Sequence, residues 1–168
     1  MADGPHAKKY TACLNINRIY CEKHRYEFHA QHPAWPTPEV GYGSSGEAYY
    51  MPYQKPYVLL ENLHTVDYVV WVDIDAVFVN HEKRIEDVIN LAPERDIIYF
   101  DDIASKKSLN SGVLIVKSNA AGSFMLWKWW EACRTMGTKS RGLLNWDQGI
   151  LIELLKNFIP GHKFEPLP

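Results

Sequence analysis

Two aspartates, Asp73 and Asp75, close an apolar run within residues 67–80. The residues before them, 68–72, read Tyr-Val-Val-Trp-Val, which is typical of a strand covered on both faces. Because residues two apart on an extended chain point the same way, we expect both carboxylates to project together. Converging carboxylates repel one another, and a divalent cation with oxygen ligands is the simplest group to relieve that repulsion. The alternative is a pair of helix-capping or solvated turn aspartates.

Other residues that could bind a ligand or take part in catalysis lie before and after this run. Lys55 stands at the start of an expected helix, where an ammonium and free backbone N–H groups suit an anionic ligand. Asn110 and Gly112 open an apolar strand, and the glycine allows the backbone to approach a ligand closely. Asp147 begins another expected helix. Each has an ordinary alternative, namely a solvated lysine, a tight turn and a helix N-cap.

The periodicity of apolar residues predicts the elements that position these side chains. Strands are expected at 26–30, 68–72, 96–100 and 109–116, and helices at 10–24, 56–64, 82–91, 120–133 and from 145 onward. Strands that alternate with helices indicate an α/β layered domain with a parallel or mixed sheet. Residues 33–46 read as a loop that is either a lid or a plain connection, and 158–168 as strand-like at its ends. The tryptophans of the 120–133 helix are interpreted mainly as core.

Composition limits the classes of function. A chain of 168 residues with 46% hydrophobic content is most simply one domain, 1–168, with residues 1–8 disordered. The net charge of −2, without long runs of either sign, gives no electrostatic case for nucleic acid or an anionic membrane. No apolar run is long enough to span a bilayer and no signal peptide is visible. Cys13, Cys21 and Cys133 have no metal-site spacing, so we expect reduced or buried thiols.

Five stretches in order along the chain carry a family resemblance. They are Asn-Arg-Ile-Tyr-Cys-Glu-Lys-His-Arg-Tyr at 17–26, Lys-Pro-Tyr-Val-Leu-Leu at 55–60, Val-Trp-Val-Asp-Ile-Asp-Ala-Val-Phe-Val-Asn at 70–80, Asn-Ser-Gly-Val-Leu-Ile-Val at 110–116 and Trp-Asp-Gln-Gly at 146–149. This set resembles the nucleotide-sugar glycosyltransferases of the GT-A fold, in particular the galactosyl, mannosyl and xylosyltransferase group of glycosyltransferase family 34. The Asp-x-Asp motif alone is weak, whereas the ordered combination is fairly specific.

The resemblance implies a fold and an activity. The fold would be GT-A, which is Rossmann-like, with a mixed, mainly parallel sheet flanked by helices. The activity would be transfer of a sugar, with retention of configuration, from a nucleotide-diphosphate sugar to a carbohydrate or glycoprotein acceptor. It implies Mn²⁺ or Mg²⁺ as cofactor, and the Golgi lumen as location if an N-terminal anchor is missing.

The resemblance also assigns roles to individual residues. The metal ligands would be Asp73, Asp75 and His162, although a lone histidine near a chain end is equally well a surface residue. The groups that bind the donor would be Asp73, Lys55, Asn110, Gly112 and Lys163. Asp147 and Gln148 would lie against the donor sugar as the catalytic residues, where developing positive charge favours oxygen atoms.

Two alternatives to an active transferase remain open. GT-A domains begin with a strand that helps to form the nucleotide pocket, whereas we expect this chain to start in the following helix, as a fragment truncated at the N-terminus, a minimal enzyme or a degenerate domain would. A non-catalytic GT-A-like domain that binds sugar or a partner protein is therefore one alternative. The other is a phosphatase with Asp73 as nucleophile, although Ala76-Val77 replaces the Gly-Thr usual in that class.

Overall fold

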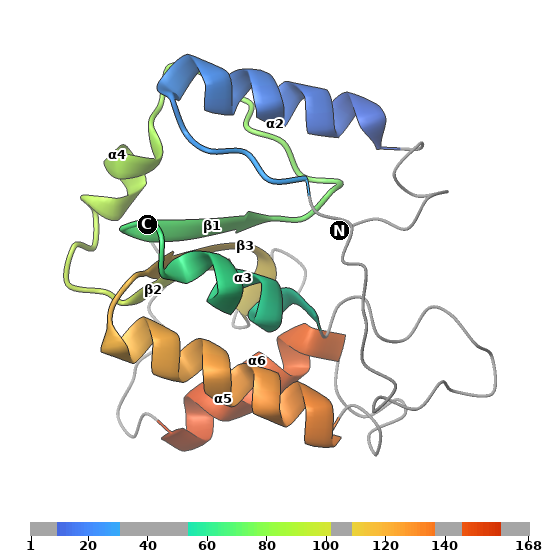
Figure 1. Ribbon diagram of the computed structural model, residues 1–168, viewed down its shortest axis with the longest axis vertical. Helices are drawn as coiled ribbons and strands as arrows, with labels where there is room; N and C mark the ends of the chain where they lie inside the picture. The colour runs from blue at the N-terminus through green and yellow to red at the C-terminus, as the bar shows by residue number, and fades with distance from the viewer. Residues whose placement is uncertain (1–9, 31–53, 102–108, 137–145, 159–168) are drawn as a thin grey trace.

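The computed structural model describes residues 10–30, 54–101, 109–136 and 146–158. Its helices and strands follow one another as α2 (Thr11–His24), α3 (Lys55–Leu63), β1 (Tyr68–Val72), α4 (Ile85–Ile89), β2 (Ile97–Asp101), β3 (Leu109–Lys117), α5 (Ala120–Met136) and α6 (Trp146–Phe158) (Figure 1). All five predicted helices and three of the four predicted strands are confirmed, with boundaries shifted by a few residues. The 33–46 loop and the strand-like end after residue 158 lie outside the described residues.

The sheet has the strand order β1-β3-β2, and β3 is antiparallel to both neighbours. β1 and β2 therefore run in the same direction, with the reversed strand β3 between them. The α/β class is confirmed. The mainly parallel sheet is not confirmed, because both pairs of described strands are antiparallel. A parallel connection needs a dozen or more residues, and too few separate Asp101 of β2 from Leu109 of β3.

The strand predicted at 26–30 is wrong. The segment follows α2 as an extended stretch, but it belongs to no strand and pairs with none of the described ones. Its first residue instead completes the end of α2: Arg25 adopts a left-handed conformation with φ 61°, and Tyr26 N donates to Cys21 O at 2.9 Å. Aromatic residues favour strands only where a neighbouring strand is present to pair with them.

Helices cover both faces of the sheet (Figure 1). Side chains on one face, including Trp71 and Leu114, pack against α3, α5 and α6 to form the larger core. Side chains that alternate with them, including Ile98 and Ile115, pack with α4 on the opposite face. This alternation is the reason that β1 reads as continuously apolar, since both of its faces contact other elements.

The three tryptophans of α5 have different environments. Trp129 is 1% exposed and belongs to the core, whereas Trp127 is 46% exposed. Trp130 is partly buried. The core interpretation is therefore confirmed for Trp129 and wrong for Trp127, because residues two apart on a helix lie on different faces.

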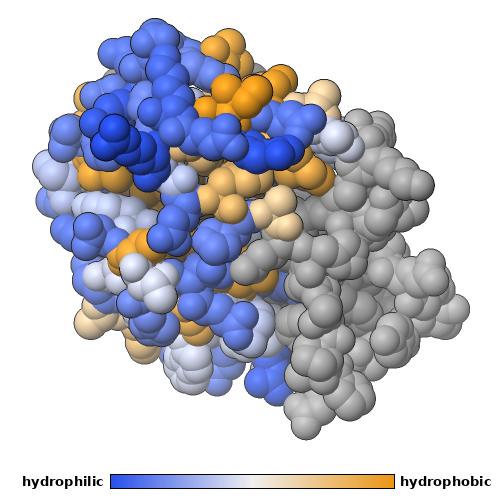
Figure 2. Space-filling view, turned by 45° about the horizontal axis from the view of Figure 1, so that its top comes forward, coloured by the Kyte–Doolittle hydropathy of each residue, from blue (hydrophilic) through white to orange (hydrophobic). Residues whose placement is uncertain are grey.

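The face shown in Figure 2 is mostly hydrophilic, with small apolar patches between the polar side chains. Exposed apolar residues of α2 include Ile19, of which 57% is accessible. Within the described ranges, no helix combines the length and the apolarity that crossing a bilayer requires.

Candidate active site

An irregularity in β3 lies next to the end of β1. Tyr99 of β2 pairs with Leu114, whereas the following residue Phe100 pairs with Asn110, so residues 111–113 have no partner in β2. On the other side, Asp73 N donates to Gly112 O at 2.7 Å, directly after β1 ends. The Asn-Ser-Gly stretch therefore lies beside the first aspartate of the Asp-x-Asp motif.

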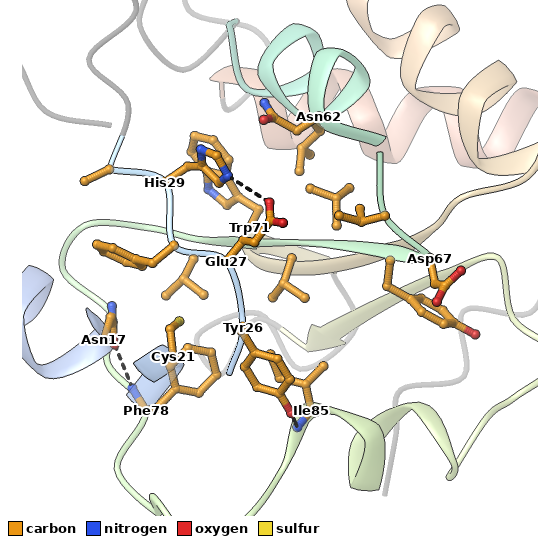
Figure 3. Close-up of a pocket in the computed structure, with 18 of the residues that line it drawn as sticks. Asn17, Cys21, Tyr26, Glu27, His29, Asn62, Asp67, Trp71, Phe78 and Ile85 are labelled. Atoms are coloured by element: carbon orange, nitrogen blue, oxygen red, sulfur yellow. Dashed lines mark hydrogen bonds and ion pairs between the residues drawn. The ribbon is translucent and has the colours of Figure 1, made fainter. Parts of the chain in front are cut away.

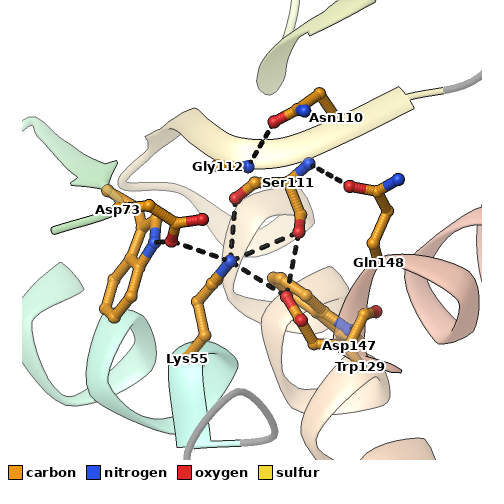
Figure 4. A network of polar contacts seen from close by, with 9 residues as sticks. Lys55, Asp73, Asn110, Ser111, Gly112, Trp129, Asp147 and Gln148 are labelled. Carbon is orange, nitrogen blue, oxygen red and sulfur yellow. Dashed lines mark hydrogen bonds and ion pairs between the residues drawn. The ribbon is translucent and has the colours of Figure 1, made fainter. Parts of the chain in front are cut away.

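A buried lysine connects this stretch to both acidic motifs (Figure 4). Lys55, the first residue of α3, is 3% exposed. Its Nζ lies 2.9 Å from Asp147 Oδ2 and 3.2 Å from Asp73 Oδ1. The same ammonium donates to Ser111 O at 2.9 Å and to Ser111 Oγ at 3.2 Å. The solvated-lysine alternative is therefore wrong, and we call Lys55, Asp73, Ser111 and Asp147 the Lys55 network.

Two indole rings hold the carboxylate-bearing residues of this network. Trp71 Nε1 donates to Asp73 Oδ1, and the same ring lies 5.2 Å from Lys55 Nζ, within range of a cation–π contact. Trp129 Nε1 donates to the backbone oxygen of Asp147 at 3.0 Å. The first indole therefore restrains the Asp73 carboxylate, and the second restrains the backbone of Asp147.

Asp147 and Gln148 lie in the first turn of α6, and the side chains of both contact β3. Asp147 is 5% exposed, and its Oδ2 accepts a hydrogen bond from Ser111 Oγ at 2.9 Å. Gln148 Oε1 accepts one from Ser111 N at 3.1 Å. Asp147 is therefore a buried partner of Lys55, not a solvated N-cap. The structure brings both residues to the same end of the sheet as Asp73.

Asn110 and Gly112 lie on either side of Ser111 in the irregular part of β3. Asn110 Oδ1 accepts a hydrogen bond from Gly112 N at 2.7 Å. A Cβ at residue 112 would lie 2.8 Å from that oxygen and 3.1 Å from Asp73 Oδ2. A larger residue at this position would displace the Asn110 side chain and press on Asp73, so the expected close approach of the backbone takes place against Asp73.

The chain leaves β1 sooner than the alternation argument assumed. The strand ends at Val72, and Ala76 N donates to Asp73 O at 2.9 Å, which closes a turn over residues 73–76. Asp73 is half-buried within the Lys55 network, whereas Asp75 is exposed. We expected the strand to continue through Asp73 and Asp75, so that its alternation would point both carboxylates the same way. That argument is wrong, because the two residues belong to a turn.

Two carboxylates among the described residues have oxygen atoms that a cation could use. Asp73 Oδ1 is used by Lys55 and Trp71, while Oδ2 and the carboxylate of Asp75 have no partner among the described side chains. These hard oxygen atoms fit Mn²⁺ or Mg²⁺. No cluster of three or more His, Cys, Asp and Glu occurs within the described ranges. His162 and Lys163 lie outside them.

The cysteines offer no nucleophile to this site. All three are free thiols, and Cys21 and Cys133 are buried. Burial raises the pKa of the Cys133 thiol far above its usual value, and the nearby carboxylate of Asp147 adds to this effect. Burial likewise raises the pKa of Cys21. The expectation of reduced or buried thiols is confirmed.

Sequence reasoning missed Ser111 and Trp71. Ser111 lies between two residues that were identified, and its hydroxyl contacts both Lys55 and Asp147. A small polar residue at the entry of an apolar strand was the available signal. Trp71 lies two residues before Asp73, on the same side of an extended chain, which was the signal for their contact.

A separate cavity of about 780 Å³ lies between β1, α2 and the segment 26–30 (Figure 3). None of the four residues of the Lys55 network lines this cavity. Trp71, which contacts the network, does line it. Its lining is mainly apolar, with Phe28, Val69 and Val70 among the residues. The polar site and this cavity are therefore distinct places in the fold.

Comparison with known proteins gives a likeness in fold. No family model matches the chain, and no curated protein matches it in sequence. Among solved structures, a glycosyltransferase involved in the glycosylation of the major capsid of PBCV-1 superposes with a TM-score of 0.65 at 17% sequence identity, over 90% of this chain and 72% of that chain. The chain therefore has a glycosyltransferase-like fold.

Proposed function

We propose that the protein is a metal-dependent glycosyltransferase, which moves a sugar from a nucleotide-diphosphate sugar to a hydroxyl acceptor with retention of configuration. The observation that carries this proposal is the convergence of Asp73, Lys55 and Asp147 at the end of β1 in a chain with a glycosyltransferase-like fold. A GT-A family 34 relationship, a carbohydrate or glycoprotein acceptor and a Golgi location are inferred from the sequence motifs alone.

The metal would be held by Asp73 and Asp75, with His162 as the third ligand that the sequence resemblance suggests. A bound Mn²⁺ or Mg²⁺ would supply Lewis-acid stabilisation to the departing diphosphate. Asp73 contributes an oxygen that the Lys55 network does not use, and Asp75 contributes an exposed carboxylate. Asn110 and Gly112 lie in β3 beside Asp73, and the absence of a side chain at Gly112 leaves room for the Asp73 carboxylate.

The donor sugar would lie against Asp147 and Gln148. Lys55 and Ser111 already fix the carboxylate of Asp147, so this group would not have to reorganise as positive charge develops on the sugar. The three protons of the Lys55 ammonium are occupied by two carboxylates and by Ser111. We therefore assign Lys55 to holding the two acids, in place of the phosphate contact that the sequence suggested, and leave Lys163 as the basic group for the phosphates.

Ligand-dependent stabilisation tests the proposal directly. Thermal unfolding is measured with UDP, GDP, ADP and CDP, each with and without Mn²⁺. A ligand at one hundred times its Kd adds about 2.7 kcal/mol to the free energy of unfolding, which is readily seen. We expect one nucleotide to stabilise the protein only when Mn²⁺ is present. If no nucleotide does so, the proposed donor site is wrong.

Asp75→Asn tests the metal role. Because Asp75 is exposed, the substitution should change the stability of the free protein by less than about 0.5 kcal/mol. It should nevertheless abolish the Mn²⁺-dependent stabilisation. Asp67→Asn is the matched control, since Asp67 is also exposed and directly precedes the other end of β1. Equal Mn²⁺ dependence in both variants would refute the metal assignment.

One observation favours a second function, a non-catalytic domain that binds a sugar nucleotide. Asp147 is buried and its Oδ2 is already engaged by Lys55 and Ser111, an arrangement that also suits a purely structural ion pair. Release of the nucleoside diphosphate from sugar nucleotides separates the two functions. A transferase releases it, with slow hydrolysis when no acceptor is present, and NMR of the sugar product reports retention. A binding domain is stabilised by the same sugar nucleotide but releases no product.

A further inference from the structure

Helix α2 lies along the segment that follows the Asp-x-Asp motif and brings one buried amide to it (Figure 3). Asn17 is 5% exposed, although most of the surrounding helix is partly or fully accessible to solvent. Burying a side-chain amide costs little free energy only when both its oxygen and its nitrogen form hydrogen bonds.

Asn17 finds both partners on one short stretch of backbone. Its Nδ2 donates to Ala76 O at 2.9 Å, and its Oδ1 accepts from Phe78 N at 3.1 Å. One planar side chain therefore fixes the chain direction immediately after Asp75.

The backbone on the other side of Asp75 is fixed by the sheet. Asp73 N donates to Gly112 O at 2.7 Å, and Ala76 N donates to Asp73 O at 2.9 Å. Asp75 thus stands between a contact to β3 and a contact to α2, and its own side chain is exposed. The relative position of the Asp73 and Asp75 carboxylates depends on both contacts.

We propose that Asn17 is a positioning residue, which holds the turn of the Asp-x-Asp motif so that the Asp75 carboxylate can bind a divalent cation together with Asp73. This inference rests on the proposed function, in which both aspartates are metal ligands. Groups that orient metal ligands without touching the metal commonly change its affinity by about 10–100-fold when they are removed.

A purely structural role for Asn17, the docking of α2, makes a different prediction. Tyr20, one turn further along α2, also docks on the same segment: its ring stacks on Phe78 with centroids 3.9 Å apart, and its hydroxyl donates to Lys83 O at 2.8 Å. Tyr20→Phe removes that hydrogen bond but leaves the backbone next to Asp75 untouched. It is therefore the matched control for loss of a docking contact.

The experiment compares Asn17→Ala with Tyr20→Phe in the intact chain. Mn²⁺ is titrated by electron paramagnetic resonance in the presence of UDP or GDP, whichever stabilises the unmodified protein more. We expect Asn17→Ala to weaken Mn²⁺ binding by at least about tenfold and Tyr20→Phe to leave it unchanged. Equal Mn²⁺ affinity in the Asn17→Ala variant and the parent would overturn the positioning role and leave the proposed function intact.

Asn17→Asp covers the case in which the alanine variant fails to fold. The carboxylate has the size of the amide and accepts from Phe78 N, but it cannot donate to Ala76 O. Its negative charge would by itself favour a cation, so weaker Mn²⁺ binding in this variant reports lost geometry, and unchanged or tighter binding contradicts the proposal.

Amide hydrogen exchange of residues 74–78 provides a readout that does not involve the metal. Exchange there should accelerate in Asn17→Ala, which removes the acceptor of Phe78 N, and remain at the parent rate in Tyr20→Phe. Parent-like exchange in the Asn17→Ala variant would refute the contact itself. Absence of Mn²⁺ binding in the unmodified protein would be a distinct result, which removes the proposed metal site and the positioning role together.

Discussion

Lys55→Met is the substitution for which the structure makes the sharpest prediction. Methionine keeps the apolar stem of the lysine within the start of α3 but removes the ammonium that lies 2.9 Å from Asp147 Oδ2 and 3.2 Å from Asp73 Oδ1. Asp147 is then left 5% exposed, and among the described residues the Ser111 hydroxyl is the remaining hydrogen-bond donor to its carboxylate. Asp73 is half-exposed, so water can replace the lysine there.

The expected cost follows from the charge that stays behind. Removing one member of a buried ion pair costs about 3–5 kcal/mol, because the other charge remains buried without compensation. By contrast, the exposed pair of Lys156 and Glu153 on α6 should contribute about 0.3–0.5 kcal/mol. The two lysines therefore differ by nearly an order of magnitude in their expected contribution to the free energy of unfolding.

Urea unfolding measures this difference. Lys156→Met is the control. The single variant Asp147→Asn and the double variant with Lys55→Met complete a double-mutant cycle. Because Asp147→Asn removes the buried negative charge, the double variant should lose less stability than the sum of the single losses. If Lys55→Met costs no more than Lys156→Met, or if the single losses add, the Lys55 network is not the stabilising ion pair that its geometry indicates.

Three further outcomes are expected. In the folded protein Cys133 should not react with a thiol reagent at neutral pH, because burial raises the pKa of its thiol. It should react once the protein is unfolded in urea, and equal rates in the two states would contradict its burial. Gly122→Ala should lower the free energy of unfolding by about 1–3 kcal/mol, because the added Cβ would lie 2.2 Å from Lys117 O; an unchanged urea midpoint would contradict this. Burial alone would raise the pKa of Glu86, but hydrogen bonds from Tyr26 and Arg84 lower it below the usual value. The stability contributed by Glu86 is therefore present above about pH 4.3 and lost as the pH falls through the lowered pKa, so Glu86→Gln should be less sensitive to pH than the parent in unfolding measured between pH 6 and pH 3.

The local elements could be predicted because their signals are local. The 3.6-residue spacing in α2 and the apolar run of β1 identify these elements with nearly correct ends. The strand predicted at 26–30 failed because aromatic content says nothing about whether a partner strand is present. The direction of β3 was predictable in principle, since the short connection from β2 already excludes a crossover, but the alternation of helices and strands concealed it.

The motifs indicated which residues lie near one another, but not how they contact one another. Motif order placed Asp73, Asp147 and Gln148 together, and the structure brings all three to the irregular part of β3. Spacing could not reveal that Lys55 is buried between two of these acids, because the partners come from α3, the turn after β1 and α6. Such contacts depend on tertiary packing between distant segments.

The position of Lys55 also changes the charge balance of the proposed metal site. The sequence suggested that a cation must separate two aspartates, and the structure shows an ammonium between Asp73 and Asp147 instead. One oxygen of Asp73 is thereby engaged by the ammonium, which leaves its second oxygen and Asp75 for a divalent ion. Sites with so few carboxylates bind Mg²⁺-like ions together with the phosphate oxygens of a substrate. Since coupling between two ligands is reciprocal, the diphosphate would gain as much affinity from the metal as the metal gains from the diphosphate. This is the physical reason for testing nucleotide and Mn²⁺ together, because either one alone would meet an incomplete site.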